Sequence, residues 1–138
     1  MSLFTNGVRL LQGGHLVAED FDLLSQNGVA AVVNATHNLH EPSWLGRPGA
    51  PAWIRFPVSS MYPSMRRNPA TCVERWLSLF RWVDPWLASG KTVLVHCRAG
   101  AHRAGTVTTA MLMALRHTDL ATAEREASSM MWVCRRVM

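Results

Sequence analysis

The chain has 138 residues, of which 49% are hydrophobic and 17% are charged, and its formal net charge at pH 7 is +5. This length fits one domain, and this composition excludes a disordered protein. No apolar stretch approaches the roughly 20 residues that a membrane-spanning helix needs, and the N-terminus lacks the basic and apolar regions of a secretory signal.

Short apolar and amphipathic segments alternate along the first half of the chain. Residues 8–11 form an apolar segment that a pair of glycines stops. A helix is predicted over about residues 18–26, with Gly28 where a C-terminal glycine belongs. The continuous apolar run of residues 29–33 predicts a strand that is buried on both faces.

The middle of the chain predicts a second strand, a loop and a long helix. Residues 53–56 read as a strand that Pro57 ends, and residues 59–68 read as a loop. Asn68 followed by Pro69 is typical of a helix start, and apolar residues at steps of three and four extend the predicted helix to about residue 88.

The last third of the chain predicts another strand and two helices. Residues 92–95 form a buried strand, a largely apolar helix runs from Arg103 to about residue 116, and a last helix extends toward residue 133. Strands that alternate with helices indicate an α/β fold. We therefore predict a single domain with a mostly parallel central sheet of about four or five strands, flanked by helices on both faces.

The segment after the strand at residues 92–95 carries the chemistry. The strand leads into Cys97, small and basic residues follow, and Arg103 opens the next helix. Amide groups of such a loop and of a helix N-terminus attract anions, so they would hold a phosphate and stabilise negative charge on the Cys97 sulfur. Arg103 can bind two phosphate oxygens. We predict Cys97 and Arg103 as catalytic residues, and the phosphate-binding residues as Arg98, Ala99, Gly100, Ala101, His102 and Arg103.

The cysteine count and the net charge suggest the compartment and the kind of partner. Cys72, Cys97 and Cys134 form an odd set without repeated spacing, which favours a reducing compartment. We therefore expect a cytoplasmic location, with the nucleus as the alternative. The positive charge is nearly all arginine and suggests an anionic partner, although scattered arginines are also compatible with a compositional bias.

The segment from Val95 through His96 and Cys97 to Arg103 resembles the signature of the cysteine-based protein tyrosine phosphatases. Gly100 stands where the dual-specificity subfamily has glycine. The resemblance covers most of residues 1–138 and implies one catalytic domain, whose C-terminus is compatible with truncation because relatives usually continue into another helix. It also implies a cysteinyl-phosphate intermediate formed on Cys97 and hydrolysed by water, with no cofactor.

The sequence departs from this family at two positions. Relatives carry an aspartic acid that protonates the leaving group on the loop after Phe56-Pro57-Val58, where this chain has Ser59-Ser60. Relatives usually have Ser or Thr directly after the arginine, where this chain has Ala104. The first departure predicts a bias toward good leaving groups, and the second predicts slow hydrolysis of the intermediate.

Few residues are available to replace the missing acid, and none forms an obvious metal site. The candidates are Glu41, His37, His40 and His102, although each also reads as a solvated loop residue. A metal site at His37, His40 and His96 is disfavoured, because the spacing matches no known metal class. Cys72 resembles a resolving cysteine that could form a disulfide with Cys97, but packing is the preferred interpretation of Cys72 and Cys134.

Three functions compete. The first is a monomeric protein phosphatase of the tyrosine or dual-specificity type, acting on phosphorylated proteins or peptides without a membrane partner. The second is an RNA 5′-triphosphatase, which suits the basic charge, although no stripe of arginines and aromatics marks an RNA track. The third is a pseudophosphatase that binds phosphorylated partners, which Ser60 and Ala104 favour and which Cys97 and Arg103 oppose.

Overall fold

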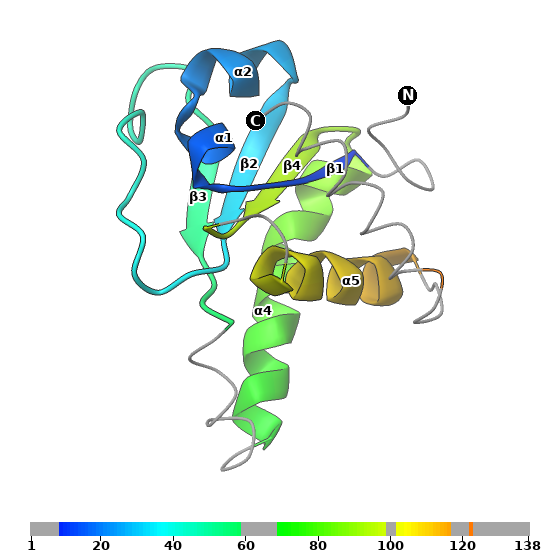
Figure 1. Cartoon of the computed structure of the whole chain (residues 1–138). Coiled ribbons are helices and arrows are strands. Elements are labelled where there is room, and N and C mark those ends of the chain that lie inside the picture. The colour runs from blue at the N-terminus through cyan, green and yellow to red at the C-terminus, as the bar shows by residue number, and fades with distance from the viewer. Residues whose placement is uncertain (1–8, 59–68, 99–101, 117–121, 123–138) are drawn as a thin grey trace.

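The computed structural model describes residues 9–58, 69–98, 102–116 and 122. Its elements follow the chain in the order β1 (Leu10–Gly13), α1 (His15–Glu19), α2 (Phe21–Gln26), β2 (Val29–Asn34), β3 (Ala52–Arg55), α4 (Pro69–Ala88), β4 (Thr92–His96) and α5 (His102–Arg116) (Figure 1). Strands and helices thus alternate as predicted, and the pairing of the strands decides where the loop after β4 lies.

The four strands form one parallel sheet in the order β1-β4-β2-β3. β4 lies inside the sheet, where Leu94 pairs with Leu11 of β1 on one side and with Val32 of β2 on the other. All five residues of β4 are buried, which explains why it reads as a continuous apolar run. The predicted α/β fold with a parallel central sheet is confirmed.

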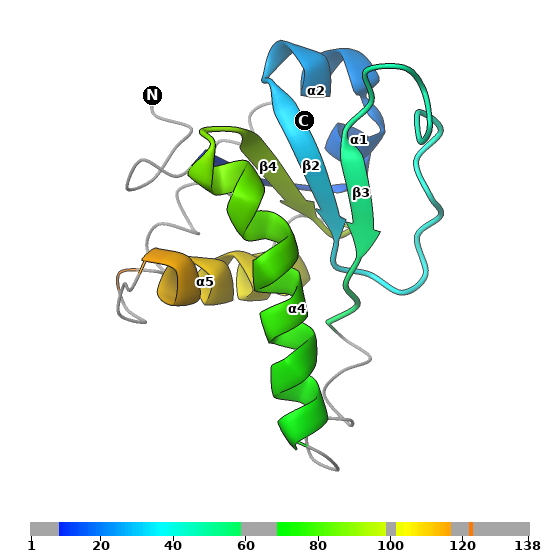
Figure 2. The same ribbon diagram turned by 180° about the vertical axis from the view of Figure 1, so that it is seen from behind.

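Helices cover both faces of the sheet (Figures 1 and 2). On one face, α1 and α2 pack through Val17 and Leu24 against Val32 and Leu94 of the sheet. On the other face, α4 and α5 pack against a larger apolar cluster. Its buried members are Leu10, Ala31, Val33, Ala35, Phe56, Leu79, Val83, Val93, Val95, Cys97, Ala104, Val107, Met111 and Leu112. Cys97 therefore belongs to the face that α4 and α5 cover.

The segment from β1 to α2 differs from its prediction. Gly13 continues β1 and pairs with His96 of β4, although a glycine pair reads as a stop. The helix predicted over residues 18–26 begins at His15 and is interrupted at Asp20, whose side chain accepts a hydrogen bond from the amide of Leu23 and caps α2. Gly28 follows α2 with a φ of 64°, in the left-handed region that favours glycine.

The two long helices begin and end close to the predicted residues. α4 ends at Ala88, and α5 begins at His102, one residue before the predicted start. The largely apolar α5 is buried at Met111 and Leu112, whereas Met113 in its C-terminal half is 38% exposed. The helix predicted toward residue 133 lies outside the described residues, except for Thr122. Among the helices that the structure describes, none has the length and apolar character to cross a membrane.

Candidate active site

Cys97 directly follows β4, at the edge of the sheet where the parallel strands end. Its backbone amide donates a hydrogen bond of 3.3 Å to the carbonyl of Gly13, which extends the β1–β4 ladder by one residue. The side chain is 3% exposed and belongs to the apolar cluster beneath α4 and α5. The backbone of the predicted nucleophile is therefore fixed by the sheet, at the edge where α/β proteins bind ligands.

Arg103 is the second residue of α5 and is half-buried. Ala104 beside it is fully buried in the apolar cluster. The unpaired amides and the dipole of a helix N-terminus favour an anion, so the start of α5 is suited to a phosphate group. Three predicted phosphate-binding residues, Ala99, Gly100 and Ala101, lie outside the described residues, as does the side chain of His102.

Arg98 begins the predicted phosphate loop, and α1 holds its backbone in place. The carbonyl oxygen of Arg98 lies 3.1 Å from the backbone nitrogen of His15 and 3.1 Å from the Nδ1 of the same residue. The Arg98 side chain is exposed. No local pattern predicts this role of His15, because only the fold brings it to a residue 83 positions away.

His96 is the last residue of β4 and is buried. Its imidazole contacts the backbone of the predicted nucleophile. Its Nδ1 lies 3.4 Å from the carbonyl oxygen of Cys97. Burial lowers the pKa of His96 from 6.5 to about 4, against the smaller opposing effects of this contact and of the Glu19 carboxylate. The imidazole is therefore neutral at pH 7.

The low pKa of His96 predicts that the folded protein loses stability in mild acid. The unfolded chain takes up a proton near pH 6.5, whereas the folded chain does so only near pH 4. The unfolding free energy that depends on neutral His96 is therefore fully present above pH 6.5 and is lost as the pH falls toward 4. At pH 4.5 the loss is about 2–3 kcal/mol of unfolding free energy. Urea unfolding at pH 7.0 and 4.5 measures it.

The matched variant for this measurement is His96→Asn, which keeps a polar side chain without a titratable group. We expect the difference in unfolding free energy between pH 7.0 and 4.5 to shrink by about 2–3 kcal/mol in this variant. An unchanged difference would show that other groups cause the acid sensitivity.

The side chain of Arg55, the last residue of β3, holds the loop after β2. It donates hydrogen bonds to the carbonyls of Thr36 at 3.1 Å and of Leu39 at 2.7 Å, and its guanidinium lies 5.3 Å from the ring centre of Trp53. Thr36 is also held by Asn34, whose Oδ1 accepts its backbone amide and its hydroxyl. No role is predicted for Arg55 above, although a charged residue within an apolar strand is a signal for such a role.

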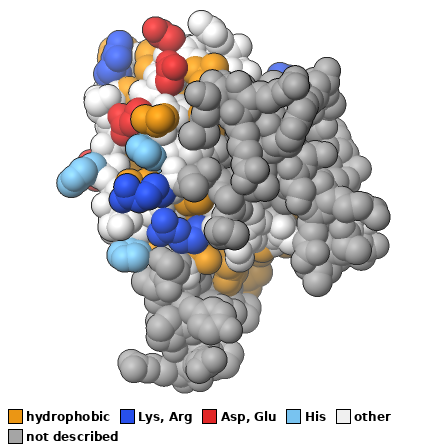
Figure 3. Space-filling model, in the orientation of Figure 1, with side chains coloured by type: hydrophobic (Ala, Val, Ile, Leu, Met, Phe, Trp, Pro, Cys, Tyr) orange, Lys and Arg blue, Asp and Glu red, His pale blue; other side chains and the backbone are white. Residues whose placement is uncertain are grey.

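Three of the four candidates for a substitute acid lie on the segment after β2, and the fourth, His102, begins α5 with its side chain outside the described residues. His37, His40 and Glu41 are all exposed, as their interpretation as solvated loop residues predicts. Figure 3 shows histidine and basic side chains side by side on one part of the surface, with most of the acidic side chains above them. Ser59-Ser60, where relatives have the acid, lies outside the described residues.

The described residues bear on the metal site but leave the disulfide untested. No group of three histidine, cysteine or acidic side chains that could hold a metal ion occurs within the described ranges. The side chain of Cys72 and the whole of Cys134 lie outside these ranges, so the interpretations of both cysteines stay predictions.

Cys97 directly follows a central parallel strand, and the next helix carries Arg103 in its first turn, which places a thiol and a guanidinium at an edge of the sheet suited to anions. Residues 12–131 match the sequence model of the family described as "Dual specificity phosphatase, catalytic domain". The chain therefore belongs to the dual-specificity phosphatases, and its activity is that of a protein phosphatase of this class. The resemblance seen in the sequence is confirmed.

Solved structures show the same fold. Human DUSP28 has 25% sequence identity and a TM-score of 0.70, with 91% of this chain and 76% of that chain covered. The active form of Tk-PTP has 24% identity and a TM-score of 0.62, with 93% and 81% covered. The human tyrosine phosphatase-like serine/threonine/tyrosine-interacting protein has 17% identity and a TM-score of 0.67, with 88% and 78% covered. A comparison with curated proteins finds no match.

Proposed function

We propose that the chain hydrolyses aryl phosphate monoesters, such as phosphotyrosine in proteins, through a phosphorylated Cys97. The observation that carries this proposal is the position of Cys97 at the end of central strand β4, with Arg103 in the first turn of the helix that follows. The loop amides and the start of α5 would hold the phosphate, and Arg103 would bind two of its oxygens.

The reaction takes two steps. In the first, the Cys97 sulfur forms a bond to phosphorus while the bond between phosphorus and the aryl oxygen breaks, and the phenolate leaves with the electron pair. In the second, water attacks phosphorus, the sulfur–phosphorus bond breaks, and phosphate and the thiolate are released. The buried methyl group of Ala104 offers no hydroxyl to the departing sulfur, which supports a slow second step.

We predict that the enzyme prefers leaving groups that need no proton. No carboxylate from residue 42 to residue 73 is available as a general acid. A phenolate leaves far more readily without a proton than the alkoxide of serine. We expect kcat/KM for a phosphotyrosine peptide to exceed that for the matched phosphoserine peptide by about 10²-fold or more. Phosphate release under identical conditions measures both.

Equal rates on the two peptides would contradict this prediction and would point to a substitute acid. His40 and Glu41 are then the side chains to replace, because both are exposed at this edge of the sheet. RNA with a 5′-triphosphate belongs in the same assay, because a phosphoanhydride also has a good leaving group. Faster phosphate release from this RNA than from phosphotyrosine would make the triphosphatase the better assignment.

We further propose that residues 1–138 act as a single catalytic domain and as a monomer in the cytoplasm, without a cofactor or a membrane partner. The length of the chain and its odd number of cysteines support these proposals. Light scattering of the purified protein and phosphatase assays with and without a chelator would test the oligomeric state and the cofactor requirement.

A further inference from the structure

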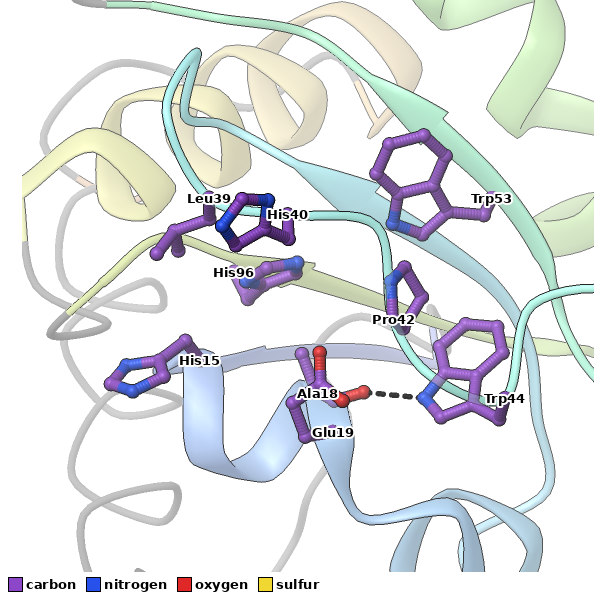
Figure 4. Close-up of a pocket in the computed structure, with 9 residues that line it drawn as sticks. All are labelled: His15, Ala18, Glu19, Leu39, His40, Pro42, Trp44, Trp53 and His96. Atoms are coloured by element: carbon purple, nitrogen blue, oxygen red, sulfur yellow. Dashed lines mark hydrogen bonds between the residues drawn. The ribbon is translucent and has the colours of Figure 1, made fainter.

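A cavity of about 140 Å³ lies behind the start of the phosphate loop, on the face of the sheet that α1 covers. We call it the rear cavity. Its lining residues are His15, Ala18, Glu19, Leu39, His40, Pro42, Trp44, Trp53 and His96 (Figure 4). His96 reaches it because side chains alternate along β4, so that the neighbouring Cys97 belongs to the opposite face. The rear cavity and the side chain of Cys97 thus lie on opposite faces of the sheet, next to each other along the backbone.

One hydrogen-bond donor in the wall has no partner among the described residues. The Nε1 of Trp53 is buried without a hydrogen bond. Figure 4 shows this nitrogen on the side of the indole that faces the cavity. By contrast, the Nε1 of Trp44 donates to the carbonyl of Ala18 at 2.7 Å. A buried N–H group without an acceptor is costly, so a ligand that offers an oxygen to Trp53 gains affinity.

The polar groups on the other side of the cavity accept hydrogen bonds. The Nδ1 of His96 lies 3.4 Å from the carbonyl of Cys97, which only accepts, so we assign the proton to Nδ1, which leaves Nε2 as an acceptor. The imidazole stays neutral because burial lowers its pKa to about 4. The Glu19 carboxylate points toward His96 from below (Figure 4), and its Oε2 accepts from the amide and the hydroxyl of Ser43 at 3.3 Å. A ligand in the rear cavity therefore needs donors toward Glu19 and His96 and an acceptor toward the Nε1 of Trp53.

A primary carboxamide has this pattern, since its oxygen accepts from Trp53 while its amino group donates to Glu19 and His96. A carboxylate would meet the charge of Glu19. A guanidinium would leave the Trp53 N–H without an acceptor. Cavities of roughly 150 Å³ bind benzene, so the rear cavity has room for one small ring. Trp44, Trp53 and Pro42 supply the apolar walls against which such a ring packs.

We propose that the rear cavity binds a small planar carboxamide and that binding alters turnover at Cys97. The coupling has two routes in the structure. His96 contacts the carbonyl of Cys97, and His15 holds the carbonyl of Arg98 through two contacts. A ligand that orders these two histidines therefore changes the position of the first residues of the phosphate loop.

Benzamide is the probe for this site, and binding is measured by protein NMR without substrate. We expect saturable shifts of the Trp53 indole N–H signal with a Kd around 1 mM, which is ordinary for a ligand of this size. Benzoate, which has the same shape and a negative charge, should bind at least about 10-fold more weakly. Equal binding of both compounds, or shifts that do not saturate, would overturn the proposal. Since this readout needs no turnover, it stands apart from the proposed phosphatase reaction.

Variants test which groups hold the ligand. Trp53→Phe keeps a ring and removes the N–H group, and it should weaken benzamide binding about 10-fold, followed through the remaining signals of the cavity. Trp82→Phe is the matched control on α4, on the opposite face of the sheet, and should leave the Kd unchanged. Unchanged benzamide binding in Trp53→Phe would contradict the proposed hydrogen bond from the Trp53 N–H group to the carboxamide oxygen. Glu19→Gln provides a second variant, with weaker binding expected, should Trp53→Phe fail to fold.

A free metabolite and a glutamine side chain of a protein substrate both present a carboxamide. Two phosphotyrosine peptides that differ only in a glutamine or a glutamate near the phosphotyrosine distinguish these sources. A lower KM for the glutamine peptide, abolished by saturating benzamide, would identify a substrate side chain. Equal KM values together with benzamide-dependent kcat would identify a free ligand. If benzamide binds and neither parameter responds, the proposed coupling to Cys97 is wrong.

Discussion

Replacing Cys97 by serine should reduce the hydrolysis of p-nitrophenyl phosphate by more than about 10³-fold. The substitution exchanges a sulfur for an oxygen of similar size, but a serine hydroxyl stays un-ionised at neutral pH and is a far weaker nucleophile. Cys97 is 3% exposed and its amide is held by Gly13, so the backbone of the variant should keep its place. Steady-state kinetics on this substrate measures the loss.

The control for this experiment is Cys134→Ser, which exchanges another thiol outside the predicted phosphate loop. We expect it to keep the wild-type rate, and both variants to keep the thermal midpoint within a few degrees. A Cys97→Ser protein with more than a tenth of the wild-type activity would contradict the assignment of the nucleophile. If that residual activity also kept the wild-type preference for phosphotyrosine over phosphoserine, a group other than Cys97 would be the nucleophile.

Replacing Trp44 by alanine should lower the free energy of unfolding by about 3–5 kcal/mol. Trp44 is fully buried in the apolar cluster beneath α1 and α2, and its Nε1 donates to the carbonyl of Ala18. Truncation leaves a cavity and leaves the carbonyl of Ala18 without this donor. Small domains have unfolding free energies of about 5–15 kcal/mol, so the expected loss is a large fraction of the total. Chemical denaturation at pH 7 measures the change.

Leu45 offers a matched control, because it follows Trp44 in the same loop and is 39% exposed. Leu45→Ala should cost less than about 1 kcal/mol. Trp44→Phe should fall in between, since it retains a ring but leaves the carbonyl of Ala18 without its donor. Similar losses for Trp44→Ala and Leu45→Ala would show that the loop contributes little to the core.

The sequence predicted the parts of the fold that follow from local patterns. β2 and β4 are buried on both faces, so they read as apolar runs without alternation. The prediction for Gly13 is wrong because a glycine pair is typical of a strand end, whereas here the carbonyl of Gly13 accepts from the amide of Cys97. The break at Asp20 was missed because an aspartate is compatible with a helix interior until its side chain caps a new turn.

The candidate site was predictable only in part, because only some of its residues belong to one local sequence pattern. Cys97 and Arg103 share one short segment, so their spacing indicates the chemistry. His15 and Arg55 act through carbonyl groups of distant residues, and no local pattern reports on such contacts. Trp44 has an apolar character that predicts burial, but its partner Ala18 is 26 positions away and is fixed only by the fold.

The central place of β4 also bears on how the protein reaches its folded state. β4 comes last among the described strands, yet it joins β1 to β2, and its contact with β1 brings together residues more than 80 positions apart, such as Leu10 and Val93. Closing so long a loop costs conformational entropy, and only the contacts of the paired strands offset this cost. Such long-range pairing slows folding. Because Cys97 directly follows β4, we expect its position to be fixed only once β4 has paired with β1 and β2.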